Sequence, residues 1–182
     1  MSDLNRQRIL DALAELDRRL GERQIQAEIC LFGGATMILA FQARQTTKDI
    51  DAIFAPTAVV RELAQQIGEE KGYATGWFND GVKGFVSARG EHAAAGLPQF
   101  PNVRVLMPVP TYLLAMKCLA ARVGTPDATD AQDVKFLLNH LGLRDPAVVL
   151  DIVGRYYSAS QIQPKTRYFV EAILEEMRRD NP

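Results

Sequence analysis

Two adjacent glycines, Gly33 and Gly34, lie where an extended segment of the chain gives way to a helical one. The residues before them, 27–32, form a short apolar run of the kind that predicts a strand. Residues 35–43 then have apolar side chains at helical spacing. Because glycine has no Cβ atom, the backbone at such a junction can approach a ligand closely. The N-terminus of the following helix would present N–H groups and a positive dipole end, which favour a phosphate.

A pair of carboxylates follows one short helix later. Asp49 and Asp51 flank Ile50 in a segment, 49–54, that alternates as a strand does. Side chains two residues apart on a strand project from the same face, roughly 6.5–7 Å apart along the backbone. Mg²⁺ prefers hard oxygen ligands and is usually held by one or two carboxylates together with substrate phosphates. A glycine pair alone is often a tight turn and an Asp-x-Asp alone is often solvated, but together they predict a site for phosphoryl or nucleotidyl transfer.

The remaining pattern predicts an α+β fold, with a small mixed sheet flanked by helices and a helical C-terminal half. We expect an α/β core over residues 1–108, including an N-terminal helix capped by Ser2 or Asp3, and a helical region over 109–182 packed on that core. Expected strands cover 27–32, 49–54 and 103–107, and expected helices cover 2–22, 35–43, 58–71, 110–122, 127 or 129 to 141, 146 onward and 164–178.

Composition limits the classes of partner. The chain has 182 residues and a formal net charge of -1, so no global positive field would gather DNA. A nucleic-acid substrate would need a local basic patch, for which Lys83, Arg104, Lys117, Arg122 and Lys135 are scattered candidates. Cys30 and Cys118 lack CxxC spacing and are expected to be buried free thiols. No apolar stretch resembles a signal peptide or spans a bilayer, so we expect a cytoplasmic protein without a membrane partner.

The two motifs together resemble the signature of the DNA polymerase β-like nucleotidyltransferase superfamily. Two further segments are similar to bacterial minimal nucleotidyltransferases that include the abortive-infection (AbiEii-type) toxins: 77–85, with the sequence WFNDGVKGF, and 110–117, with the sequence PTYLLAMK, followed by Asp130 and Asp133. The resemblance extends from about residue 29 to residue 138. It implies a nucleotidyltransferase fold and an NTP-dependent enzyme.

The resemblance also implies roles for individual residues. Gly33, Gly34 and Thr36 would cradle the nucleotide phosphates, with Lys48 and Lys83 as further nucleotide-binding residues. Asp49 and Asp51 would be catalytic and would hold Mg²⁺ or Mn²⁺. Lys117 would reach phosphate or substrate from its helix, and Asp130 or Asp133 would complete the polar cluster. For Lys117 a surface lysine, and for Asp130 an ordinary helix-start charge, are the alternatives.

One departure from the family pattern concerns the third metal carboxylate, which full polymerase-like members carry on a later strand. The candidate strand at 103–107 offers Arg104 and no acid. Either Asp80, Glu91 or Asp133 substitutes for it, or only one metal ion binds well. Other chemistry-bearing residues give weaker signals: His92 and His140 have no metal-ligating neighbours, and Trp77, Phe78 and Phe85 fit core packing better than stacking on a base.

Two functions are therefore expected from the sequence. The first is a metal-dependent enzyme that moves a nucleotidyl group from an NTP to a protein, RNA or small-molecule acceptor. One version of this enzyme is the toxin of a toxin–antitoxin pair, which would have an antitoxin partner. The second is a catalytically degenerate member that keeps the fold and binds a nucleotide or a partner protein.

Overall fold

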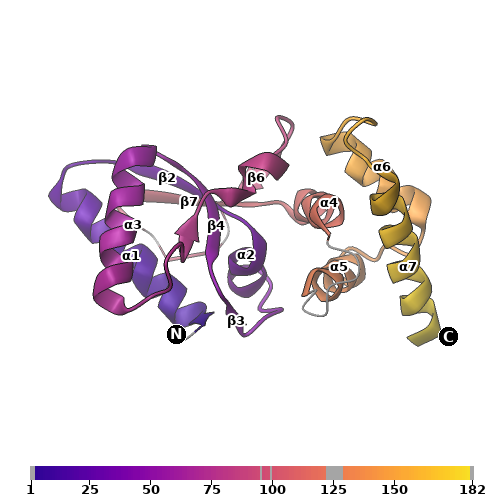
Figure 1. The fold of residues 1–182 in the computed structure, drawn as a ribbon, viewed down its shortest axis with the longest axis horizontal. Coiled ribbons are helices and arrows are strands. Elements are labelled where there is room, and N and C mark those ends of the chain that lie inside the picture. The colour runs from indigo at the N-terminus through magenta and orange to yellow at the C-terminus, as the bar shows by residue number, and fades with distance from the viewer. Residues whose placement is uncertain (1–2, 95, 99, 122–128, 181–182) are drawn as a thin grey trace. The chain divides into compact units, whose positions relative to one another are not determined.

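The computed structural model describes residues 3–94, 96–98, 100–121 and 129–180. The chain forms two compact units. The first unit, indigo to magenta in Figure 1, takes residues up to Gly84 and then His92–Pro108. The second unit takes Phe85–Glu91 and the residues from Val109 onward. Helices and a mixed sheet are both present, which confirms the predicted α+β class.

The first unit contains every strand in the described part of the chain. In chain order its elements are β1 (Leu4–Asn5), α1 (Arg6–Glu22), β2 (Ala27–Leu31), α2 (Gly33–Leu39), β3 (Thr46–Thr47), β4 (Ile50–Ala55), α3 (Thr57–Lys71), β5 (Phe78–Asn79), the 3₁₀ helix η1 (Gly81–Phe85), β6 (His92–Ala93) and β7 (Val103–Pro108). The three longer strands lie within one residue of their predicted ends, whereas the four two-residue strands were not predicted.

The main sheet has five strands in the order β5-β4-β2-β7-β6. Strand β2 is central, antiparallel to β4 and parallel to β7. The outer strands complete the mixed sheet, because β5 is parallel to β4 and β6 is antiparallel to β7. A separate two-stranded ladder joins β1 to β3.

Side-chain alternation gives the main sheet one buried face. The buried residues of this face come from β2, β4 and β7, and they are Ala27, Ile29, Leu31, Ile50, Ala52, Phe54, Val103, Val105 and Met107. Helices α1 and α3 lie together in Figure 1 and contribute Ile9, Leu13 and Leu63 to the same core cluster. The intervening residues Asp51, Ile53, Arg104 and Leu106 are less buried, so the opposite face of the sheet is where polar groups can be displayed.

Two helix starts differ from the sequence-based prediction. Helix α1 is capped by Asn5, whose side chain accepts a hydrogen bond of 2.9 Å from the Arg8 N–H. Asp3 does not cap it, because Leu4 and Asn5 pair with β3 before the helix begins; Ser2 lies outside the described residues. Helix α2 begins at Gly33, two residues earlier than predicted, and ends at Leu39.

The second unit is helical. It contains α4 (Pro110–Ala120), α5 (Thr129–His140), α6 (Pro146–Tyr156) and α7 (Pro164–Asp180), shown from orange to yellow in Figure 1. Proline opens α4, α6 and α7, as expected for a residue without an N–H group at the first helical turn. Their apolar sides form the unit's interior, with Tyr112, Val153 and Val170 all buried.

Segment 85–91 packs on these helices and is here called the strap. The Ser87 N–H donates a hydrogen bond of 2.8 Å to the Tyr112 hydroxyl. The Glu91 carbonyl accepts one of 3.0 Å from the Val109 N–H. Gly90 has no room for a side chain, because a Cβ atom there would lie 2.5 Å from the Tyr112 ring. The strap is therefore fitted to α4, although both of its neighbours in sequence belong to the first unit.

Both cysteines are buried and free, as predicted. Burial raises the pKa of the Cys118 thiol to about 12, and burial together with Glu28 raises the pKa of Cys30 to about 12. Among the helices that the structure describes, none is both long and apolar enough to cross a membrane.

Candidate metal–nucleotide site

Asp51 lies on the less buried face of the sheet, on strand β4. The strand's even and odd positions alternate between buried and half-buried, and Asp51 shares the half-buried side with Ile53. Asp49 comes immediately before the first residue of β4 and is also half-buried. The two aspartates are two positions apart, the spacing at which side chains of a continuous strand share a face, although β4 itself begins at Ile50.

The Asp51 side chain packs directly against Gly33. A Cβ atom on Gly33 would lie 2.6 Å from Asp51 Oδ2, so a side chain at this position would overlap the carboxylate. Gly33 also has φ of +58°, in the left-handed region that glycine tolerates best. In addition, the Phe32 N–H donates a hydrogen bond of 2.8 Å to the Asp51 carbonyl. The strand-to-helix junction and the carboxylate are thus joined by direct contact.

Gly34 makes an equally close approach to the segment before β4. A Cβ atom on Gly34 would lie 2.4 Å from Thr47 Oγ1 and 3.4 Å from Arg44 Nη1. The guanidinium of Arg44 therefore lies beside the glycine pair, and it brings a positive charge to the junction. The first residues of α2 receive no side-chain cap from Phe32. An anion at this end of the segment would meet backbone N–H groups and the Arg44 cation.

Asp49 is held from the neighbouring strand. Its Oδ2 accepts a hydrogen bond of 3.3 Å from Asn79 Nδ2. Asn79 lies on β5 in register with Asp51, so its side chain is close to both positions of the Asp-x-Asp motif. The structure thereby places Asn79 beside the predicted metal ligands.

The other predicted nucleotide-binding residues of the first unit have different surroundings. Thr36 is fully buried, and its hydroxyl donates a hydrogen bond of 3.0 Å to the Leu31 carbonyl. Lys48 is exposed next to Asp49. Lys83 forms an ion pair with Asp80, and Arg61 pairs with the same carboxylate at 2.6 Å. Lys83 and Arg61 hold the pKa of the Asp80 carboxyl below its usual value.

Lys117, Asp130 and Asp133 form a cluster within the second unit. Lys117 on α4 has 11% of its side chain exposed and lies 2.7 Å from Asp133 Oδ2 on α5. Asp133 is 2% exposed, whereas Asp130 is 25% exposed and lies 3.4 Å from the Lys117 ammonium. Lys117 is thus a mostly buried cation paired with a buried carboxylate, and the alternative of an ordinary surface lysine does not describe it.

Strand β7 does not supply the third carboxylate that the family pattern leads one to expect. Its exposed Arg104 pairs with Glu28 of β2 at 3.2 Å. Of the three proposed substitutes, Asp80 is engaged by Arg61 and Lys83, and Asp133 is engaged by Lys117. Glu91 accepts a hydrogen bond of 3.2 Å from the Tyr156 hydroxyl.

The donor set in the first unit fits a single hard cation. Two carboxylates on one sheet face are the protein ligands that Mg²⁺ commonly uses when substrate oxygens complete its coordination. No group of three or more His, Cys, Asp or Glu side chains suited to a metal ion occurs within the residues that the structure describes. Asp49 and Asp51 are therefore the residues of the first unit that could hold such an ion.

Three ring-bearing side chains near the motif, Trp77, Phe78 and His92, contact other protein groups. Trp77 is 5% exposed, and its Nε1 donates a hydrogen bond of 3.0 Å to the Ala64 carbonyl. Phe78 packs on Phe54 with ring centroids 5.1 Å apart. His92 meets the Phe32 ring edge-on, and burial lowers the pKa of His92. Core packing, as predicted, accounts for Trp77 and Phe78, but the prediction was wrong for Phe85, which is 40% exposed.

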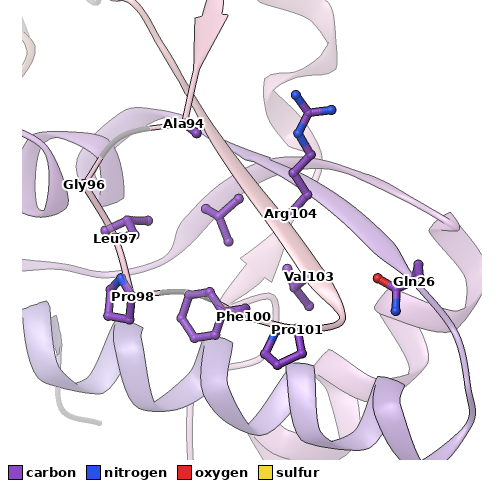
Figure 2. A pocket seen from close by; sticks show the side chains of 10 residues that line it. Gln26, Ala94, Gly96, Leu97, Pro98, Phe100, Pro101, Val103 and Arg104 are labelled. Carbon is purple, nitrogen blue, oxygen red and sulfur yellow. The ribbon is translucent and has the colours of Figure 1, made fainter.

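A pocket of about 340 Å³ lies elsewhere in the first unit, between β7 and the preceding loop. Figure 2 shows Leu97, Pro98, Phe100 and Pro101 along one side of it and Gln26 on the other. Its lining contains no carboxylate and none of the site residues predicted from the sequence. This pocket therefore lacks the ligands for a divalent metal ion.

Two residues of the candidate site were not identified from the sequence: Asn79, beside Asp49, and Arg44, beside Gly34. The signal for Asn79 was present, because it belongs to the 77–85 segment, but nothing in the sequence indicated that it faces Asp49. Arg44 lies in the connection between α2 and β3, where no motif marks it.

A family model described as "Nucleotidyltransferase of unknown function (DUF6036)" matches residues 7–137, which is more than half of the chain. The chain belongs to this nucleotidyltransferase family. No curated protein and no solved structure is significantly similar to it. The match spans the glycine pair, the Asp-x-Asp motif of Asp49 and Asp51, and Lys117, Asp130 and Asp133. The broad resemblance is confirmed, and the closer one to abortive-infection toxins stays a prediction.

Proposed function

We propose that this protein transfers a nucleotidyl group from an NTP to an acceptor hydroxyl on a protein, an RNA or a small molecule, with release of pyrophosphate and with Mg²⁺ or Mn²⁺ held by Asp49 and Asp51. The observation that supports this most strongly is the contact between Asp51 and Gly33. A metal ligand and a side-chain-free backbone segment are adjacent there, as a metal–triphosphate complex would require. Membership of a nucleotidyltransferase family supports the same class of reaction.

In this proposal the chain's own residues bind and orient the substrate. Gly33 and Gly34 would offer backbone to the phosphates, and Arg44 is the cation beside them. Lys48 and Lys83 stay predicted nucleotide-binding residues. The metal ion, when bound, neutralises charge that develops on the phosphate oxygens. Lys117, Asp130 and Asp133 belong to the second unit, and their part in the reaction stays a prediction of the resemblance. Asp49 and Asp51 orient the complex for in-line displacement.

The toxin of a toxin–antitoxin pair is the version that the resemblance favours. It predicts that expression in a bacterial host arrests growth and that Asp51→Asn relieves the arrest. Growth arrest that persists at equal protein levels in the Asp51→Asn strain would separate any toxicity from this site.

The second candidate function is a catalytically degenerate member that binds a nucleotide or a partner protein. The absence of a third metal-ligating carboxylate on β7 favours this function. In place of an acid, β7 carries Arg104, which pairs with Glu28. Binding of an NTP without turnover would identify this alternative.

The test is transfer of label from NTPs carrying a radioactive α-phosphate to candidate acceptors, with and without Mg²⁺. We expect incorporation by the wild type and almost none by Asp49→Asn or Asp51→Asn, because asparagine keeps the shape but loses the charge that attracts the metal. Asp11→Asn is the matched control, since Asp11 is an exposed carboxylate of α1 in the same unit. Equal incorporation by all four proteins would remove the assignment of the site. No incorporation by the wild type, with NTP binding retained, would favour the degenerate function.

A further inference from the structure

The Asn79 side chain makes three hydrogen bonds at the edge of the proposed metal site. Its Nδ2 donates to Asp49 Oδ2 at 3.3 Å and to the Gly76 carbonyl at 3.4 Å. Its Oδ1 accepts from the Gly81 N–H at 2.9 Å. One side chain thus links the carboxylate before β4 to the backbone on both sides of β5.

The hydrogen bonds of Asn79 separate into two parts with different chemical requirements. The bond from Gly81 is an Asx-turn, which aspartate, serine or threonine can also form through a side-chain oxygen. The bond to Asp49 requires a donor, and only the amide of asparagine supplies a donor and an acceptor of this length at once. A turn alone would not explain why the amide group meets the Asp49 carboxylate.

The place of Asn79 in the sheet gives this bond a consequence. Asn79 is in register with Asp51 on the parallel pair of β4 and β5, and Asp49 lies two positions before Asp51. A neutral donor at this point can fix one carboxylate oxygen of Asp49 without adding a negative charge beside the two aspartates. The other oxygen of Asp49 then keeps its lone pairs for a cation.

We propose that Asn79 is a positioning residue that holds the Asp49 carboxylate in the orientation in which it binds the metal ion. The inference rests on the proposed function, because it assumes that Asp49 and Asp51 are metal ligands. Residues that orient metal ligands by hydrogen bonds commonly contribute about 10- to 100-fold to metal affinity. Asn79 therefore accounts for part of the affinity of a site that has only two carboxylates.

The test measures Mn²⁺ affinity by electron paramagnetic resonance in the absence of nucleotide, together with the thermal midpoint of the metal-free protein. Asn79→Ser keeps an oxygen for the Gly81 N–H but loses the amide that donates to Asp49 and to the Gly76 carbonyl, and Asn79→Ala loses all three bonds. We expect both variants to bind Mn²⁺ about tenfold more weakly than the wild type. We expect Asn79→Ala to lower the thermal midpoint more than Asn79→Ser, because only Asn79→Ala loses the bond from the Gly81 N–H. Wild-type affinity in Asn79→Ser would overturn the inference and leave Asn79 as a turn residue.

A double-substitution cycle makes the result independent of local stability. If Asn79 acts through Asp49, then Asn79→Ser should have no further effect on Mn²⁺ affinity in the Asp49→Asn background. Additive losses would overturn the inference. The failure of the proposed function has a different signature: the wild type would bind Mn²⁺ no better than Asp51→Asn, and the inference would fall with it.

Discussion

The carboxylate of Asp51 occupies the space next to Gly33 that any side chain on residue 33 would need, with Oδ2 2.6 Å from the position of a Cβ atom. The same glycine has φ of +58°, which other residues rarely adopt. Two separate physical constraints, backbone conformation and close contact, thus apply at one residue of the α2 start. They can be separated by experiment, because Gly72 has the first constraint without the second.

Gly33→Ala should destabilise the protein more than Gly72→Ala. Gly72 has φ of +66° and nothing within 4 Å of a Cβ atom, so alanine there carries only left-handed strain, roughly 1–2 kcal/mol. Alanine at residue 33 adds overpacking against Asp51, roughly 1–3 kcal/mol more. Urea unfolding of both variants checks the difference, and Mn²⁺ affinity should fall only in Gly33→Ala. Equal losses of stability would mean that Asp51 moves aside without cost.

Gly68→Ala should be destabilising even though alanine normally favours a helix. Gly68 lies inside α3, and a Cβ atom there would lie 2.4 Å from Trp77 Nε1. Overpacking of the buried Trp77 should outweigh the gain in helix propensity of about 1 kcal/mol. Gly154→Ala is the matched control, because it lies in α6 with open space around a Cβ atom and should stabilise by about 0.5–1 kcal/mol. Thermal unfolding distinguishes the two signs; stabilisation by both substitutions would contradict the packing argument.

Asp133→Asn should cost much more stability than Asp130→Asn. Asp133 is 2% exposed and 2.7 Å from Lys117, so its loss leaves a mostly buried ammonium without its main partner, at a cost of about 3 kcal/mol. Asp130 is more exposed and more distant, and its neutralisation should cost at most about 1 kcal/mol. Chemical denaturation gives both values. Similar small losses would show that Asp130 alone can compensate Lys117.

The two thiols should be unreactive in the folded protein near pH 8. Burial raises the pKa of Cys118 to about 12, and the pKa of Cys30 is raised to about 12 as well. Unfolded thiols ionise near about 8.5, so the folded state retains protons that the unfolded state loses. The contribution of these thiols to the free energy of unfolding is therefore complete below about pH 8.5. It declines as the pH rises from there through 12.

Titration with a thiol-reactive disulfide reagent checks this prediction. Little reaction is expected at pH 8 until guanidinium is added, and Ala159→Cys, at an exposed position, should react at once. Rapid reaction of the wild type without denaturant would contradict the burial of Cys30 and Cys118.

The fold class could be predicted because the longer elements carry their own periodic patterns. Strands β2, β4 and β7 and helices α3, α4, α5 and α7 begin and end close to the predicted residues, and α6 begins at the predicted Pro146. The two-residue strands could not be predicted in this way. They exist through pairing with residues far along the chain, such as Leu4 with Thr47 and Asp51 with Asn79, and two residues contain no periodicity.

The candidate site shows the same difference between local motifs, which could be predicted, and contacts between distant residues, which could not. The glycine pair and the two aspartates could be found because each motif is short and local. Asn79 and Arg44 could not, because the contacts that bring them to Asp49 and Gly34 depend on the packing of β5 and of the α2–β3 connection. The catalytic roles of Asp49 and Asp51 remain predictions that the labelling experiment addresses, and the role of Lys117 stays a prediction.

The strap has a consequence for how this chain can be recombined. Part of the helical unit is encoded ahead of β6 and β7, since Ser87 and Glu91 bond to Tyr112 and Val109. A single crossover at the end of β7 would transfer α4–α7 without the strap, and would leave the Tyr112 hydroxyl and the Val109 N–H with foreign neighbours. Exchange of the helical unit between homologues therefore requires two grafts, 85–91 and the residues from 109 onward, inherited as a pair.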